Sequence, residues 1–191
     1  MTPLLKRHGI PVLDAIHRGQ GRLSKLDVHR QTRIPWGTLC RVIEALQAQK
    51  LIGLRTEKPA GRGRPTQPIS LREEAVFFIG LDVGASQTKC VVCALGGRVV
   101  GHTETPTPEY RGKDAFFRWL ALFAKKTFEP LALPRRKIHS LGLSVSGSVD
   151  SERSLIVSGG NFGLPWGENL SVSEFAPGGI PCCYAVNTQG A

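Results

Sequence analysis

A run of apolar residues at helical spacing constrains the fold of this chain more than any other feature. Its members share one face of a helix that begins near Pro35: Leu39, Val42, Ile43 and Leu46. Two shorter helical patterns precede it, at 11–18 and 24–31, and only residues 32–34 separate the second helix from the third. This spacing predicts three packed helices with a tight turn before the last one.

The ends of the first two helices carry recognisable signals. Pro11 suits a first helical turn and Gly19 suits a helix end. Ser24 and Asp27 have the spacing of a capping box, in which each side chain satisfies a backbone N–H of the other residue. We expect the second helix to turn three apolar residues inward: Leu23, Leu26 and Val28.

A helix, a tight turn and a second helix form the arrangement in which the last helix enters the DNA major groove. The candidate contact residues lie near the starts of the second and third helices: Ser24, Lys25, Pro35, Trp36, Gly37, Thr38 and Arg41. Arg41 could give paired hydrogen bonds to guanine or a charged contact to a phosphate. The same residues could also be the exposed face of a plain three-helix bundle, with Trp36 in a packing role.

Positive charge is concentrated in the same part of the chain. Residues 1–74 hold 14 basic and 6 acidic side chains, whereas residues 75–191 hold 11 and 9. A concentrated positive field attracts polyanions, although it could equally serve solubility. Together with the helices, this charge favours a nucleic-acid partner.

Two short strand patterns, 51–55 and 69–71, flank a segment rich in glycine and arginine. Its core, Gly61 to Pro65, has no apolar residue to bury and resembles an AT-hook. Arg62 and Arg64 suit the narrow, electronegative minor groove, while a flexible linker would have a similar composition. We therefore predict that residues 1–74 form a winged helix-turn-helix DNA-binding domain.

The second part of the chain, 75–191, has a mixed α/β pattern. A buried strand at 76–81 and a returning strand at 89–95 flank a hairpin rich in glycine and hydroxyl groups. Four residues of this hairpin are candidates for a nucleotide-phosphate loop: Asp82, Gly84, Ser86 and Thr88. Carboxylate-and-glycine hairpins are also common turns, so the signal is weak by itself.

The five cysteines are odd in number and follow no export leader, which favours reduced thiols and a cytoplasmic location. No apolar run is long enough to span a membrane. Cys90 and Cys93 have the spacing of a metal or redox pair, but side chains three apart on a strand point to opposite faces. We therefore expect no metal site in this chain.

The order of these segments resembles the ROK family of repressors, open reading frames and kinases. Residues 24–52 resemble the DNA-reading segment of its regulators, 61–65 their wing, and 78–89 their ATP-phosphate hairpin. Two later segments also match: 142–150 is similar to the family's glycine-containing strand and turn, and 161–170 resembles a sugar-binding segment. The resemblance implies an actin-like, ribonuclease-H-like second domain, with Asn161 and Asn187 as sugar candidates or as structural loop residues.

The departures from the family pattern argue against a sugar kinase. The family's catalytic Asp corresponds to Thr188, which cannot take a proton from a sugar at neutral pH, and losing a general base costs about 100- to 10,000-fold in rate. Ser86 and Gln87 stand where the kinases have Thr and Lys, which leaves ATP binding open. An active kinase with an added DNA-binding domain is the alternative. It would need another base, such as Asp150.

The resemblance also implies partners and missing parts. About half of the second domain, with a zinc motif and most of a dimer surface, would lie beyond Ala191, so no cofactor is expected in this chain. A regulator of this type would bind operator DNA as a homodimer, most often as a repressor, and respond to a sugar or sugar phosphate. A constitutive DNA binder whose effector pocket has decayed is a third possibility.

Overall fold

In the computed structural model the chain forms two compact units, residues 1–75 and 76–191. The structure describes residues 3–55, 67–109, 112–150, 152–153, 155–158, 170–172, 175 and, as backbone, 182–187. Each unit buries its own cluster of apolar side chains. Each unit therefore has a hydrophobic core of its own.

The first unit begins with helix α1 (Pro3–Arg18), which starts eight residues before the expected position and contains Pro11 in its interior. The prediction that Pro11 opens this helix is therefore wrong. The residues buried along α1 continue on both sides of the proline: Leu5, Gly9, Val12, Ala15 and Ile16. Burial of this continuous stripe offsets the backbone hydrogen bond that Pro11 cannot make.

Helices α2 (Lys25–Thr32) and α3 (Trp36–Ala48) follow with a three-residue turn between them. The predicted stripe of α3 is confirmed, since all four of its apolar residues are buried. The expectation for Leu26 is wrong, because this side chain is 46% exposed. Leu26 precedes the buried Val28 by two residues, which places the two side chains on nearly opposite sides of α2.

Strands β1 (Ile52–Leu54) and β2 (Ile69–Leu71) pair antiparallel, with Ile52 opposite Leu71. Ile52 and Ile69 are buried in the core that the three helices form. The backbone N–H of Ile69 donates to the carbonyl of Leu23 at 2.8 Å, which ties the hairpin to the segment before α2. The tip of the predicted wing, with Arg62 and Arg64, lies outside the described residues.

The second unit contains a five-stranded sheet in the order β10-β6-β3-β4-β5. Strands β3 (Phe77–Val83), β6 (Ile138–Val145) and β10 (Cys182–Asn187) are parallel, and β4 (Gln87–Ala94) and β5 (Val99–Pro106) continue the sheet as an antiparallel meander. The expected strands at 76–81 and 89–95 appear as β3 and β4. A smaller sheet contains β7 (Ser148–Asp150), β8 (Leu155–Ser158) and β9 (Leu170–Ser171).

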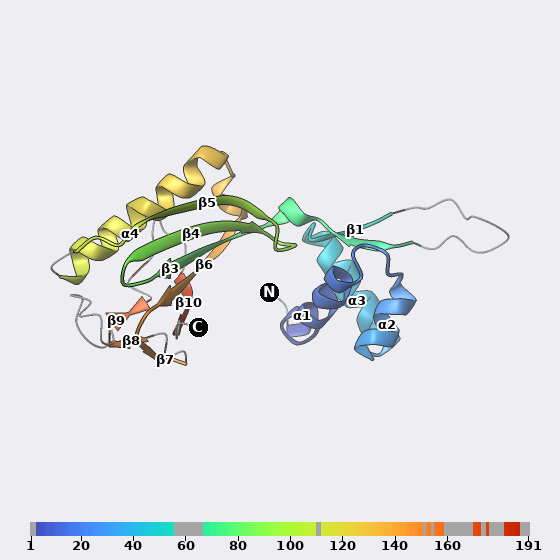
Figure 1. Ribbon diagram of the computed structural model, residues 1–191. Helices are drawn as coiled ribbons and strands as arrows, with labels where there is room; N and C mark the ends of the chain where they lie inside the picture. The colour runs from blue at the N-terminus through green and yellow to red at the C-terminus, as the bar shows by residue number, and fades with distance from the viewer. Residues whose placement is uncertain are drawn as a thin grey trace. The chain divides into compact units, whose positions relative to one another are not determined.

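Helix α4 (Lys113–Phe128) lies against one face of the five-stranded sheet (Figure 1). It buries Phe116, Leu120 and Ala124 against the inward residues of the strands, among them Leu81 and Leu143. The alternation of buried and half-exposed residues along β3 and β6 follows from the strand period of two. None of the described helices combines the length and apolar character needed to cross a membrane.

The two cysteines of β4 differ in their surroundings as the strand period predicts. Cys90 is fully buried and Cys93 is half-buried on the other face of the strand. Within the part of the chain that the structure describes, no three His, Cys, Asp or Glu side chains gather as metal ligands would.

The Cys90 thiol should be unreactive in the folded chain. Burial raises its pKa to about 11, although a hydrogen bond with Thr127 acts in the opposite direction. Because the thiolate is the nucleophile, Cys90 should resist iodoacetamide at pH 8, while Cys40 and Cys93, both partly exposed, react faster. Peptide mass spectrometry after timed labelling measures each site, and equal labelling of Cys90 and Cys93 would contradict the expectation.

Candidate nucleic-acid interface

The start of α2 is fixed by the predicted capping box. The hydroxyl of Ser24 donates to Asp27 Oδ2 at 2.6 Å and accepts the backbone N–H of Asp27 at 3.3 Å, while the backbone N–H of Ser24 donates to Asp27 Oδ2 at 3.0 Å. The bonds that Asp27 accepts from Ser24 hold the pKa of this carboxyl below its usual value, and the bond from the side-chain hydroxyl has the larger effect. The Ser24 hydroxyl, a predicted DNA contact, therefore already has two partners inside the cap.

The cap makes stability depend on pH. A carboxyl whose pKa is lower in the folded chain stabilises the fold above its unfolded pKa, and this contribution is lost as the pH falls through the folded pKa. Ser24→Ala should cost about 1 kcal/mol at neutral pH. Asp27→Asn should likewise lower the free energy of unfolding at pH 7. The loss should be much smaller in acid, at a pH below the lowered pKa of Asp27 in the folded chain. Urea unfolding at both pH values measures this, and an equal loss at both would contradict it.

The turn between α2 and α3 contains a left-handed residue that is not glycine. Arg33 has φ 55°, and its backbone N–H donates to the carbonyl of His29 at 2.8 Å. The hydroxyl of Thr32 donates to the carbonyl of Val28 at 2.8 Å. Since a left-handed conformation is unfavourable for a residue with a Cβ, these bonds at the end of α2 help to hold it and so set the direction of α3.

His29 and Trp36 connect the two helices across this turn. The imidazole Nδ1 of His29 lies 2.7 Å from the carbonyl oxygen of Ile34. Its ring is nearly perpendicular to the indole of Trp36, with an interplanar angle of 88° and 5.6 Å between ring centroids. His29 is not among the site residues predicted from the sequence. The one sequence feature that could have indicated His29 is its position seven residues before the aromatic residue Trp36.

The start of α3 presents an open face. Trp36 is 48% exposed, and Pro35, Gly37 and Arg41 are also exposed, while Thr38 is half-buried. A Cβ built on Gly37 would meet no atom within 4 Å. Gly37 and Arg41 are four residues apart and therefore lie on one side of the helix. This face is free for a partner to approach closely.

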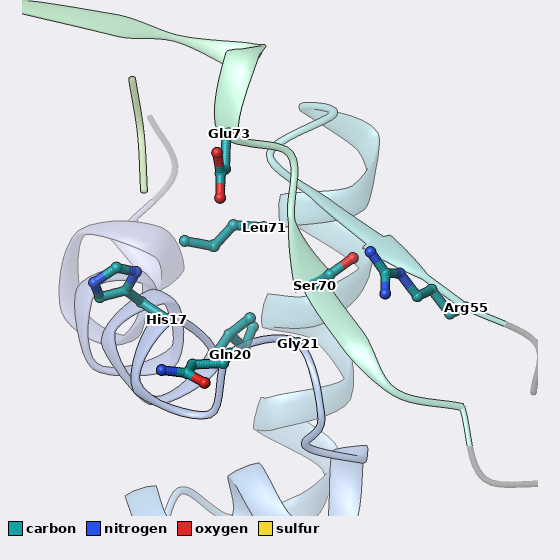
Figure 2. Close-up of a pocket in the computed structure, with 8 residues that line it drawn as sticks. His17, Gln20, Gly21, Arg55, Ser70, Leu71 and Glu73 are labelled. Atoms are coloured by element: carbon teal, nitrogen blue, oxygen red, sulfur yellow. The ribbon is translucent and has the colours of Figure 1, made fainter. Parts of the chain in front are cut away.

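A small pocket of about 250 Å³ lies at the base of the hairpin. Figure 2 shows His17 and Gln20 extending from the end of α1 and the turn after it, and Ser70 and Arg55 from the hairpin. Gly21 has φ 73°, and a Cβ there would lie 3.2 Å from the Cβ of Ser70, so the turn and β2 approach closely. No sequence motif predicted this pocket.

The predicted phosphate hairpin is a tight turn between β3 and β4. The backbone N–H of Gly84 donates to the carbonyl of Gln87 at 2.9 Å, and a Cβ on Gly84 would lie 2.8 Å from that oxygen. Glycine is therefore required by the turn itself. Ser86 is exposed, but Thr88 is fully buried and its hydroxyl lies 2.9 Å from that of Thr107. The hydroxyl of Thr88 is therefore buried beside Thr107, and a phosphate contact by Thr88 stays a prediction.

Asp82 lies on the sheet face opposite to α4, between Lys89 and Ser144 in the strand register. Neither Asp82 Oδ1 nor Ser144 Oγ has a hydrogen-bond partner among the described residues, although both atoms are buried. They line a groove of about 360 Å³ together with Gly80 and Gly142. Of the sugar candidates, Asn161 and the side chain of Asn187 lie outside the described residues, as does Thr188.

No family model matches the chain. Transcriptional regulators of Mycobacterium bovis and Mycobacterium tuberculosis are each 28% identical to it over 136 residues, which cover 70% of this chain and 30% of each relative. The matched part of the chain thus spans less than a third of the length of these relatives.

The crystal structure of a ROK family transcriptional regulator, described as a homologue of the Escherichia coli Mlc protein, has a similar fold. It matches with a TM-score of 0.70 and 19% identity over 93% of this chain and 46% of its own. This match confirms the resemblance to ROK proteins at the level of the fold.

Proposed function

We propose that this chain is a ROK-type transcriptional regulator that binds duplex DNA through a winged helix-turn-helix in its first unit. The observation that carries the proposal is the open face of α3, where Trp36, Gly37 and Arg41 are exposed directly after a turn fixed by hydrogen bonds. The antiparallel hairpin that follows has the position of a wing. The similarity to curated transcriptional regulators supports the same function.

In this proposal α3 lies in the major groove with its first turns against the bases. Gly37 allows close approach, and Arg41 gives paired hydrogen bonds to a guanine. Lys25, at the start of α2, contacts a phosphate of the flanking backbone, where positive charge adds affinity without sequence preference. The excess of eight positive charges in residues 1–74 strengthens this non-specific part of binding.

The second unit is the regulatory part of the proposal. A sugar or sugar-phosphate effector would weaken DNA binding only if it binds more tightly to a conformation in which the two DNA-binding units of a homodimer are not positioned to bind the operator together. This mechanism therefore requires a homodimer with two conformational states. Sugar phosphorylation is not part of the proposal, because the resemblance to ROK kinases aligns Thr188 with their carboxylate base, and threonine cannot take a proton at neutral pH.

Selection from a library of random duplexes at moderate salt tests this function. The chain is used as it is and, in parallel, fused to a dimeric coiled coil. The fusion ensures that weak dimerisation of the chain alone does not prevent enrichment. Enrichment of one sequence, called here the selected duplex, is the expected outcome. No enrichment by either form would overturn the proposal.

The two arginines of the predicted wing tip should contribute mainly at A·T-rich flanks. Replacing Arg62 and Arg64 with alanine should weaken binding where the flanks are A·T-rich and have less effect where they are G·C-rich, because the narrow A·T minor groove attracts arginine. Titration of the selected duplex with each type of flank measures the difference. An equal loss on both flanks would indicate a simple phosphate contact.

A further inference from the structure

We infer that His29 is a positioning residue that orients Trp36 at the start of the recognition helix and thereby sets the sequence preference of the chain. The inference rests on the proposed DNA-binding function. His29 lies on α2, not on the helix that meets the bases, and would act through its neighbour. Two separate contacts of its imidazole carry the inference.

The first contact fastens the turn. The carbonyl oxygen of Ile34 can only accept a hydrogen bond, so the Nδ1 that lies 2.7 Å away must carry a proton and donate it. The backbone carbonyl of His29 accepts the N–H of Arg33 at 2.8 Å. Residue 29 is therefore bonded to two successive residues of the turn, one of which has the left-handed conformation.

The second contact fixes the indole. Its nearly perpendicular packing on His29 is a favourable geometry for aromatic pairs. Trp36 remains 48% exposed, so one part of the indole is held by the protein while another part is open. An exposed side chain without such support would populate several rotamers, and binding would have to select one of them. A tryptophan held in place by His29 can instead present the same edge to every duplex.

The hydrogen bond and the ring contact can be removed one at a time. His29→Asn keeps an amide N–H close to the position of Nδ1 but removes the ring. His29→Phe keeps a ring beside Trp36 but cannot donate to Ile34. His17→Asn, on the exposed end of α1, is the matched control for the chemical change.

The readouts are the thermal midpoint, the ¹⁹F spectrum of protein labelled with 5-fluorotryptophan, and the affinities for the selected duplex and a scrambled duplex of the same composition. The chain has three tryptophans, and Trp36→Phe assigns the signal of Trp36. We expect His29→Asn to keep the midpoint, to move the Trp36 signal, and to reduce the ratio of the two affinities by about tenfold, the upper range for loss of an aromatic pair. His29→Phe should lower the midpoint and keep most of the ratio.

Several results would overturn the inference. The first is a His29→Asn variant whose Trp36 signal and affinity ratio equal those of the wild type. The second is a fall in the affinity ratio that is proportional to the fall in thermal midpoint in both variants, because such a fall would show a merely structural role. In a Trp36→Ala background, His29→Asn should cause no further loss of ratio, because the residue through which it acts is gone. If the wild-type chain has no sequence preference at all, the proposed function fails and this inference fails with it.

Discussion

Replacing Arg41 with alanine should weaken binding to the selected duplex by about 1 to 3 kcal/mol and relax the base preference at one position. Arg41 is exposed on the side of α3 that also contains Gly37, so its guanidinium can reach a base edge without displacing core residues. An arginine that reads guanine gives two hydrogen bonds that no other base pair satisfies. The loss should therefore be large on the selected duplex and small on the scrambled one.

The salt dependence distinguishes this role from a phosphate contact. A base-reading Arg41 should leave the slope of log affinity against log salt nearly unchanged, whereas loss of a phosphate contact would reduce the slope by about one. Arg7→Ala, at an exposed position of α1, is the matched control and should affect both duplexes alike. An equal loss on every sequence for Arg41→Ala would contradict the base-reading role.

Leu39→Ala should cost about 2 to 5 kcal/mol of folding free energy in the first unit and abolish DNA binding at 37 °C. Leu39 is 0% exposed and lies in the core that α1, α2, α3 and the hairpin share. A unit of about 75 residues has only a few kcal/mol of stability, so a cavity of this size would unfold much of the population.

A matched substitution in the other core tests whether the two units are independent. Leu120 of α4 is also 0% exposed, but it belongs to the core of the second unit. Leu120→Ala should lower stability by a similar amount and leave binding to the selected duplex close to that of the wild type. Circular dichroism melts and duplex titrations measure both effects. If Leu120→Ala abolished binding as fully as Leu39→Ala does, the two cores would not be independent.

The elements that could be predicted from the sequence are those with a clear period. The stripe of α3 and strand β2 were predicted closely, because spacing alone decides which residues face a core. The start of α1 was missed because Pro11 suggested a helix boundary, whereas the apolar stripe on its N-terminal side stabilises a longer helix. Leu26 was assigned to the core on its hydrophobicity, although its angular position opposes that of Val28.

The candidate site was predictable where exposure follows from helical position, and not where it depends on a turn. Arg41 is exposed, as its helical position opposite the buried stripe of α3 predicts. Trp36 precedes Leu39 by three residues, a spacing that predicts the buried side, yet it is 48% exposed as the first residue of α3. Thr88 was assigned to the loop, but β4 already begins at Gln87 and turns this hydroxyl inward toward Thr107. His29 was missed because its two contacts exist only once the turn has brought α2 and α3 together.

The ratio of affinities for the selected and scrambled duplexes, measured by competition over a range of salt concentrations, tests the central claim most directly. For the dimeric fusion we expect a ratio of at least about a thousandfold at physiological salt, since specific binding exceeds non-specific binding by about 10³ to 10⁷. Both affinities should fall as salt rises. A ratio near one at every salt concentration would mean that the first unit binds polyanions through its charge alone, and would contradict a regulator that reads sequence.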